Sequence, residues 1–215
     1  MRKQERKGKS QILRIIENHI YHNAKQYSIV CILFLIGIVA GVFFINHVEI
    51  GTKQQIENEL TTFLYSLKTD YQIDSISLLK TVMGNHIVFT FLMWFMGCMV
   101  IGIPMVYGLV AFRGFSLGYT ISSILYTLGT GKGTLFCILS LVLQNIFIIP
   151  VILALAVSGI KLYQSIMKDK RKENIKIEIV RHTIFSLFML AILMVATIME
   201  VYGSNTLISA CVKYF

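Results

Sequence analysis

The chain has 215 residues, of which 55% are hydrophobic and only 14% are charged. Ordinary globular domains carry about 25% charged residues, and a soluble domain of this length would leave large apolar patches exposed to water. The formal net charge is +9, but most of the Lys and Arg residues gather in two stretches, 1–25 and 161–181, that flank apolar segments. This placement argues against nucleic-acid binding and favours a membrane protein whose basic segments face anionic lipid.

The N-terminal segment, residues 1–26, is expected on the cytoplasmic side of the membrane. Residues 1–9 form a short basic tail. From residue 11 to residue 26, apolar side chains recur at helical spacing and polar ones occupy much of the opposite side, which predicts an amphipathic helix. This helix could lie on the inner leaflet or pack against the membrane spans.

The first apolar segment, residues 27–45, predicts a membrane span and an uncleaved signal anchor. Its 19 residues carry no charge, and at 1.5 Å per residue they cover roughly the 30 Å hydrocarbon core. Residues 46–86 follow as the longest polar segment between spans, expected on the outer side. One helix face of this loop could dock a partner or pack on the outer ends of the spans. Its apolar residues are Ile56, Leu60, Phe63 and Leu64.

Four more apolar segments complete an all-α, five-span transmembrane domain over residues 27–202. The predicted spans are residues 87–112, 115–128, 134–160 and 182–202. Pro104 interrupts the second span, and Arg113 with Gly114 is expected to form the turn that follows it. Residues 203–215 form a short outer tail.

The third span is weakly apolar, and the distribution of basic residues decides whether it crosses the membrane. Five spans place 15 Lys and Arg residues in the cytoplasm and five outside. If residues 115–128 stayed inside, this asymmetry would vanish, contrary to the positive-inside rule. We therefore expect a cytoplasmic N-terminus, a cytoplasmic loop at residues 161–181 and an outer C-terminus.

Small residues at helical spacing predict close helix packing. Gly37 and Gly41 stand four apart in the first span, and Gly114, Gly118 and Ser122 do the same in the third. These faces could pack within the chain, against a second copy in a homo-oligomer, or against a partner. We expect Gly97 and Gly102 to be packing positions as well.

Polar residues inside the later spans are the other candidates for function. Gln144 and Asn145 lie near the middle of the fourth predicted span, with Pro150 shortly after them. Buried amides in lipid need hydrogen-bond partners, so the pair should face other helices. It could join helices beside a proline kink, line a solute pathway, or recognise a partner. Glu200, the only acid in a predicted span, is expected at the outer interface as an ionised carboxylate, or to be buried beside a cation.

The sequence contains no set of residues typical of catalysis or of a cofactor site. The GTGKG segment at residues 129–133 lacks the phosphate-loop pattern, because Tyr126 stands where a glycine is needed and Gly133 where Ser or Thr is needed. The cysteines and histidines do not show metal-ligand spacing. We therefore expect no enzymatic activity, no cofactor and no metal.

A family resemblance becomes specific at residues 80–118, which read KTVMGNHIVFTFLMWFMGCMVIGIPMVYGLVAFRGFSLG. The positions that carry it are Asn85, Gly97, Gly102, Gly114, Phe115 and Gly118. With the chain length, the basic N-terminal helix and the five-span layout, they resemble the stage II sporulation protein M family of spore-forming bacteria. The run QNIFIIP at residues 144–150 is similar to the same helix in sporulation members, whereas broader relatives tend to carry a His-Gly and a Glu there.

The resemblance implies a role in engulfment during sporulation. Family members sit in the septal and engulfing membrane on the mother-cell side, as the platform of a complex with two peptidoglycan-degrading partners, stage II sporulation proteins D and P. This chain would then be a non-catalytic scaffold. The alternative is a small transporter or permease subunit with a site around Gln144, Asn145 and Pro150. Transporters usually carry ionisable residues at the membrane midplane, and the predicted spans place none there.

Overall fold

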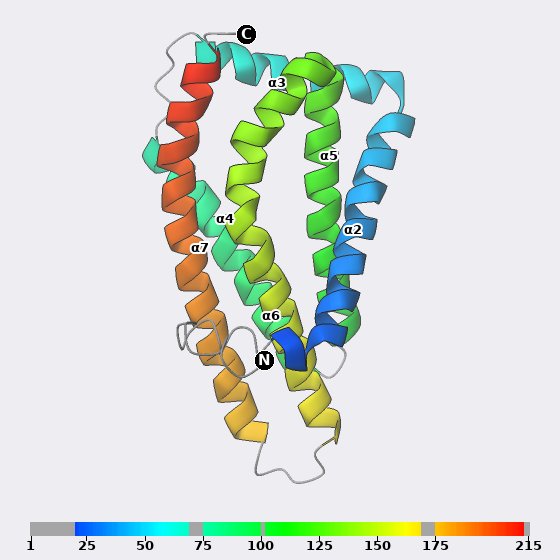
Figure 1. The fold of residues 1–215 in the computed structure, drawn as a ribbon, viewed down its shortest axis with the longest axis vertical. Coiled ribbons are helices and arrows are strands. Elements are labelled where there is room, and N and C mark those ends of the chain that lie inside the picture. The colour runs from blue at the N-terminus through cyan, green and yellow to red at the C-terminus, as the bar shows by residue number, and fades with distance from the viewer. Residues whose placement is uncertain (1–19, 69–74, 100–101, 169–174, 213–215) are drawn as a thin grey trace, which may run out of the picture.

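The computed structural model describes residues 20–68, 75–99, 102–168 and 175–212 (Figure 1). This part of the chain contains helices and no strand. Residues 20–22 are helical, but most of the predicted N-terminal amphipathic helix lies in residues 1–19, outside the described residues.

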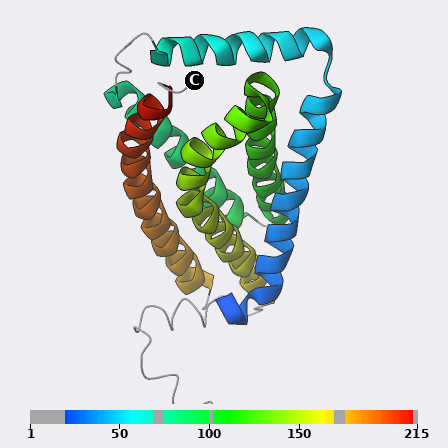
Figure 2. The ribbon, with the colours of Figure 1, turned by 45° about the horizontal axis from the view of Figure 1, so that its top comes forward.

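Five helices are long and apolar enough to cross a membrane, which confirms the predicted all-α, five-span fold class. They are α2 (Ala24–His47), α4 (Ser75–Cys98), α5 (Gly102–Cys137), α6 (Leu143–Lys168) and α7 (Ile175–Val212). A further helix, α3 (Ile50–Lys68), lies across one end of the bundle (Figure 2). A short π-helix, η2 (Ile138–Val142), leads into α6.

Helix α6 lies at the centre of the bundle. Half of its apolar span is buried, against 17–33% for the other four spans. Ile148, Ile152 and Leu155 are each 1% exposed and pack with side chains of α2, α4, α5 and α7 in one core. The other four helices surround α6 and turn their outward side chains, such as Val39 and Phe112, toward the surface that lipid would cover.

The predicted bounds of the second and third spans are wrong. Helix α4 begins at Ser75 and already ends at Cys98, and α5 runs from Gly102 through Arg113 and Gly114 without a turn. The chain reverses at Met99, whose carbonyl accepts a hydrogen bond from the Gly102 N–H at 3.0 Å. Pro104 therefore stands in the first turn of α5, where its missing N–H breaks no helical hydrogen bond.

The segments between the predicted spans are largely helical in the described part of the chain. The outer segment 46–86 holds all of α3 and the first half of α4, and the segment 161–181 is largely helical because α6 ends at Lys168 and α7 begins at Ile175. Within GTGKG, Gly129 has φ 75°, a left-handed conformation that favours glycine, and it turns α5 back toward α6.

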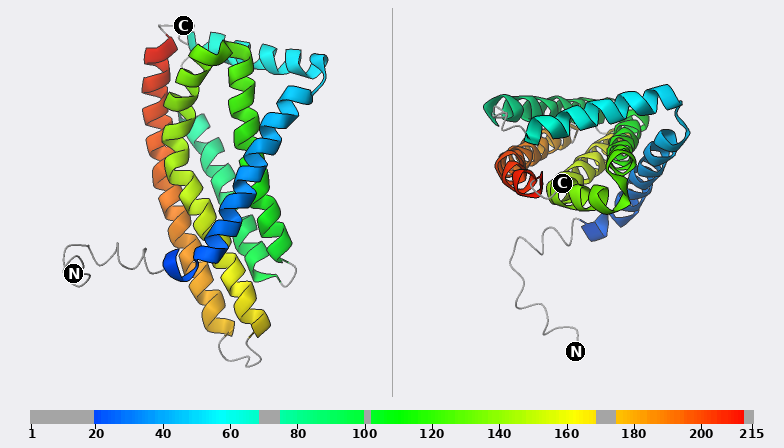
Figure 3. Two further views of the ribbon diagram at one scale, coloured as in Figure 1. Left: turned by 45° about the vertical axis from the view of Figure 1, so that its right-hand side comes forward. Right: turned by 90° about the horizontal axis from the view of Figure 1, so that it is seen from above.

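The two ends of the bundle differ. At one end α3 lies across the helices, between the end of α2 and the start of α4 (Figure 3). At the other end α6 finishes and α7 begins, close to the first turn of α2 (Figure 1). We call these the α3 end and the α6–α7 end.

Candidate functional site

Helix α3 is held against the α3 end by contacts with α5 and α7. The Lys53 ammonium donates a hydrogen bond to the carbonyl of Asn46 at 3.0 Å, which joins the start of α3 to the end of α2. The same ammonium lies 5.7 Å from the centroid of the Tyr126 ring on α5, within the range of a cation–π contact. The outer helix is therefore fixed to the membrane domain at its N-terminal part.

The four apolar residues predicted as a docking face do not share one environment. Ile56 and Leu60 are half-buried, and Leu60 packs against the cluster of Ile124, Phe136 and Cys137 at the ends of α5. Phe63 remains 49% exposed. The side chain of Leu64 lies outside the described part of the structure. Part of this face thus serves to seat α3 on the bundle.

The exposed surface of α3 is polar with two aromatic side chains. Tyr65 is 68% exposed and lies one turn from the exposed Thr61 and Thr62, whose hydroxyls donate hydrogen bonds to carbonyls of their own helix. Gln54, Asn58 and Glu59 are also exposed. An exposed polar surface that carries aromatic residues is typical of a protein-binding site.

Gly37 and Gly41 of α2 face Gly114 and Gly118 of α5 in a single interface. A Cβ at Gly37 would overlap the carbonyl oxygen of Ala111, and a Cβ at Gly114 would overlap that of Phe34. Gly41 and Gly118 meet backbone of the opposite helix in the same way, and Ser122 is buried one turn further on. The four glycines are thus used for packing within the chain, backbone against backbone.

Gly97 and Gly102 have different environments. A Cβ at Gly97 would lie 3.0 Å from Cα of Gly159 and 2.9 Å from Nε2 of His182, so this glycine lets α4 cross α6 closely. A Cβ at Gly102 would overlap the carbonyl oxygen of Met96, so Gly102 serves the turn between α4 and α5.

The polar side chain that the structure describes in the fourth predicted span, Asn145, is hydrogen-bonded within its own helical segment. Asn145 is 8% exposed, and its Nδ2 donates a hydrogen bond at 2.8 Å to the carbonyl of Leu141, in the π-helical turn of η2. Such turns leave backbone carbonyls without their usual partners, and the amide supplies one. Pro150 is exposed on α6, and the side chains of Gln144 and Glu200 lie outside the described part of the structure.

Arg113, which the sequence predicts in a turn, lies inside the continuous membrane-spanning helix α5. It stands between Ala111 and Gly114, which pack against Gly37 and Phe34 near the middle of α2. His86, at the middle of α4, is 7% exposed. The expectation that no ionisable residue lies at the midplane is therefore wrong.

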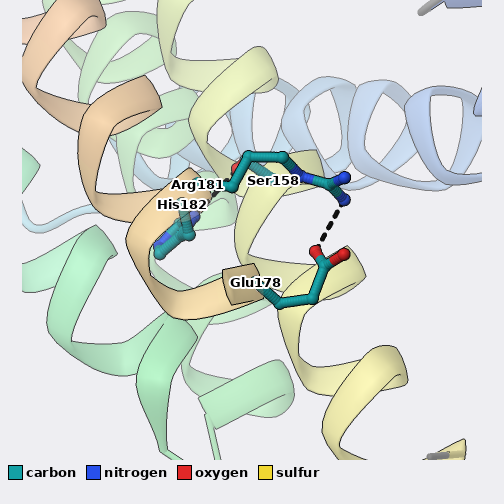
Figure 4. Close-up of polar contacts among 4 residues, drawn as sticks. All are labelled: Ser158, Glu178, Arg181 and His182. Carbon is teal, nitrogen blue, oxygen red and sulfur yellow. Dashed lines mark hydrogen bonds and ion pairs between the residues drawn. The ribbon is translucent and has the colours of Figure 1, made fainter. Parts of the chain in front are cut away.

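His182 is a second residue that the sequence analysis missed. The sequence predicts it as the first residue of the fifth span, but it stands about two turns inside α7 and is 3% exposed. Its Nδ1 lies 2.8 Å from the hydroxyl of Ser158 on α6 (Figure 4). Directly before it in the chain, Arg181 forms an ion pair with Glu178 at an N–O distance of 2.6 Å (Figure 4). The signal for this buried polar face in the sequence is the spacing of His182 and Ser186, which stand four residues apart and so share one face of α7.

Known proteins provide one match. A family model described as Stage II sporulation protein M matches residues 30–205, which include most of the first membrane-spanning segment and all of the other four. Neither the curated proteins nor the solved structures contain a match to the chain. Among the described residues, His, Cys, Asp and Glu form no group of three that could hold a metal ion.

Proposed function

The chain belongs to the stage II sporulation protein M family, and from that premise we propose that it is a non-catalytic membrane scaffold that positions peptidoglycan-degrading enzymes during engulfment. By the same family relationship, the enzymes would be stage II sporulation proteins D and P, and the site of action would be the septal and engulfing membrane of the mother cell. The family match and the five apolar helices support a multi-pass membrane protein of a sporulation family.

The observation that carries this proposal is the position of α3. Within the described residues it is the longest helix outside the five spans, and it lies across one end of the bundle. Its seating through Leu60 and Lys53 supports a rigid platform, because these contacts hold the helix in one orientation. The exposed surface around Phe63 and Tyr65 is then the surface available to a partner.

The charge distribution supports an outward orientation of this platform. Lys161, Lys176 and Arg181 lie near the α6–α7 end, and Lys25 lies in the first turn of α2 at the same end of the bundle. By the positive-inside rule that end faces the cytoplasm, so α3 faces the cell wall. A wall-facing helix is where enzymes that cut peptidoglycan would bind.

The test removes the two exposed aromatic side chains of α3 in the double variant Phe63→Ser/Tyr65→Ser. We expect co-purification of the two peptidoglycan-degrading partners from solubilised membranes to fall at least about tenfold, as loss of two interface anchors worth about 1 kcal/mol each would give. In sporulating cells the same variant should arrest engulfment at a flat septum, seen by microscopy.

Two controls separate docking from folding. Tyr21→Ser removes an 81% exposed aromatic side chain at the opposite end and should leave partner recovery unchanged. Leu60→Ser removes a packing contact and should lower thermal stability. Unchanged partner recovery with Phe63→Ser/Tyr65→Ser, in a protein of normal abundance, would reject α3 as the platform.

A further inference from the structure

Among the described residues, two buried hydroxyl oxygens lack a hydrogen-bond partner: Thr90 Oγ1 on α4 and Ser186 Oγ on α7. Each of these residues is 4% exposed. A buried polar group without a partner is costly, especially inside a membrane protein, so each of these atoms calls for a partner.

Neither hydroxyl is bonded to the backbone of its own helix. Thr183 and Thr197, on α7 like Ser186, each donate a hydrogen bond at 2.8 Å to the carbonyl four residues before them in the helix. Thr90 and Ser186 make no such bond. Their hydroxyls therefore remain available to a group between the helices.

Contacts across α4 and α7 bring these residues to similar depths. Trp94 donates a hydrogen bond from Nε1 to Oγ1 of Thr183 at 3.0 Å, and His182 lies against Gly97. Because the helices run antiparallel, moving one turn from Trp94 to Thr90 corresponds to moving one turn along α7 past Thr183, which reaches the level of Ser186. Both residues also stand near the middle of their spans. We call the surface formed by Thr90, Gly97, His182 and Ser186 the α4–α7 seam.

We propose that the α4–α7 seam is a water-binding site inside the membrane domain. Water fits the chemistry, because one molecule can accept a hydrogen bond from one hydroxyl and donate one to the other. The seam lacks acidic side chains, so it offers no ligand set for a hard metal cation.

The seam continues a buried polar face of α4. His86 stands one turn from Thr90 on this helix and is 7% exposed. Water bound between Thr90 and Ser186 accounts for the unpartnered hydroxyls at mid-depth.

Hydroxyl-radical footprinting of the full-length protein in nanodiscs tests the proposal, because radicals formed from bound water oxidise adjacent methionines. Met93, one turn from both Thr90 and Gly97 and only 1% exposed, is the reporter. We expect Met93 to be oxidised in the wild-type protein and its oxidation to fall severalfold in Thr90→Val/Ser186→Ala. The matched control is Thr197→Val, which removes a buried hydroxyl already bonded to its own helix and should leave Met93 oxidation unchanged.

A melting curve of each variant gives an independent readout. If water binds the two hydroxyls, removing them deletes hydrogen bonds and Tm falls or stays constant. If the hydroxyls are dry, removing them relieves an unpaired buried group and Tm rises. A rise in Tm, an unlabelled Met93 in the wild type, or equal labelling in wild type and double variant would each overturn the proposal. Should the double variant fail to fold, Ser186→Ala alone is judged by the same criteria.

Discussion

Two helix–helix interfaces of this protein are held together by different kinds of contact. Between α2 and α5, four glycines bring the backbones into direct contact, and Gly37 meets Ala111 with no side chain between them. Between α4 and α7, side chains fill the interface, with Trp94 bonded to Thr183 and His182 pressed against Gly97. The first interface depends on shape and the second on polar groups.

The two interfaces should differ in how well they tolerate amino-acid substitutions. Lipid is as apolar as a leucine side chain, so helices in a membrane gain little from hydrophobic contact and associate through close packing or hydrogen bonds. A backbone-to-backbone contact has no flexible atoms that can move aside. A side-chain interface can adjust rotamers, and hydrogen bonds between membrane helices contribute only about 0.6 kcal/mol on average. We therefore expect substitutions to be most damaging between α2 and α5.

The largest effect is predicted for Gly114→Ala. The new Cβ overlaps the carbonyl of Phe34, and only separation of α2 from α5 can relieve the overlap. We expect a loss of about 3 kcal/mol in the free energy of unfolding, measured by steric trapping or by thermal denaturation in detergent. Gly108→Ala is the matched control on the same helix, since its Cβ meets nothing within 4 Å, and it should be neutral or slightly stabilising. Equal stability of the two variants would contradict the backbone contact.

An intermediate effect is predicted for Gly97→Ala. Its Cβ would lie 2.9 Å from His182 Nε2, which can move, and 3.0 Å from Cα of Gly159, which cannot move easily. We expect a loss of about 1–2 kcal/mol in unfolding free energy. Adding His182→Ala should recover part of this loss if the ring is one of the obstructing groups. Gly84→Ala, with open space around its Cβ, provides the reference on α4, and a loss there as large as at Gly97 would dismiss the steric explanation.

The smallest effect is predicted for the Trp94–Thr183 hydrogen bond. A double-mutant cycle with Trp94→Phe and Thr183→Val isolates the coupling between the two side chains from the loss of packing. We expect a coupling free energy of about 0.6 kcal/mol from thermal denaturation of the four proteins. A strong hydrogen bond between membrane helices contributes about 1.7 kcal/mol. A coupling free energy above that value would mean that substitutions destabilise the α4–α7 interface as much as the α2–α5 interface, and would contradict the comparison.

The sequence predicted the class and the number of spans well because both depend on local hydrophobicity. It predicted the second and third spans poorly, because the run from Ile87 to Phe112 contains no charged residue at which a turn could be recognised. A charged residue is costly in lipid, so Arg113 was the natural place for a turn. The usable signal is Gly102 followed by Pro104, a pattern that suits the start of a helix better than an interruption within one.

The sequence also could not show which part of the candidate docking surface is covered by another helix. Helical spacing put Ile56, Leu60, Phe63 and Leu64 on one face, which is correct for a helix seen alone. Only the helix that lies beneath α3 decides that Leu60 packs inward while Phe63 stays exposed. Periodicity describes which residues share a face, and tertiary contact decides what covers that face.

By itself, the sequence determined that the chain is a helical membrane protein with five apolar segments and glycines spaced for close packing, since these properties follow from composition and from the geometry of a single helix. The tertiary structure decided which glycines meet, that Arg113 and His86 lie at mid-depth, and that His182 pairs with Ser158. The physical reason is that pairing between helices depends on their order, tilt and rotation. Apolar segments resemble one another too closely to specify these three quantities one segment at a time.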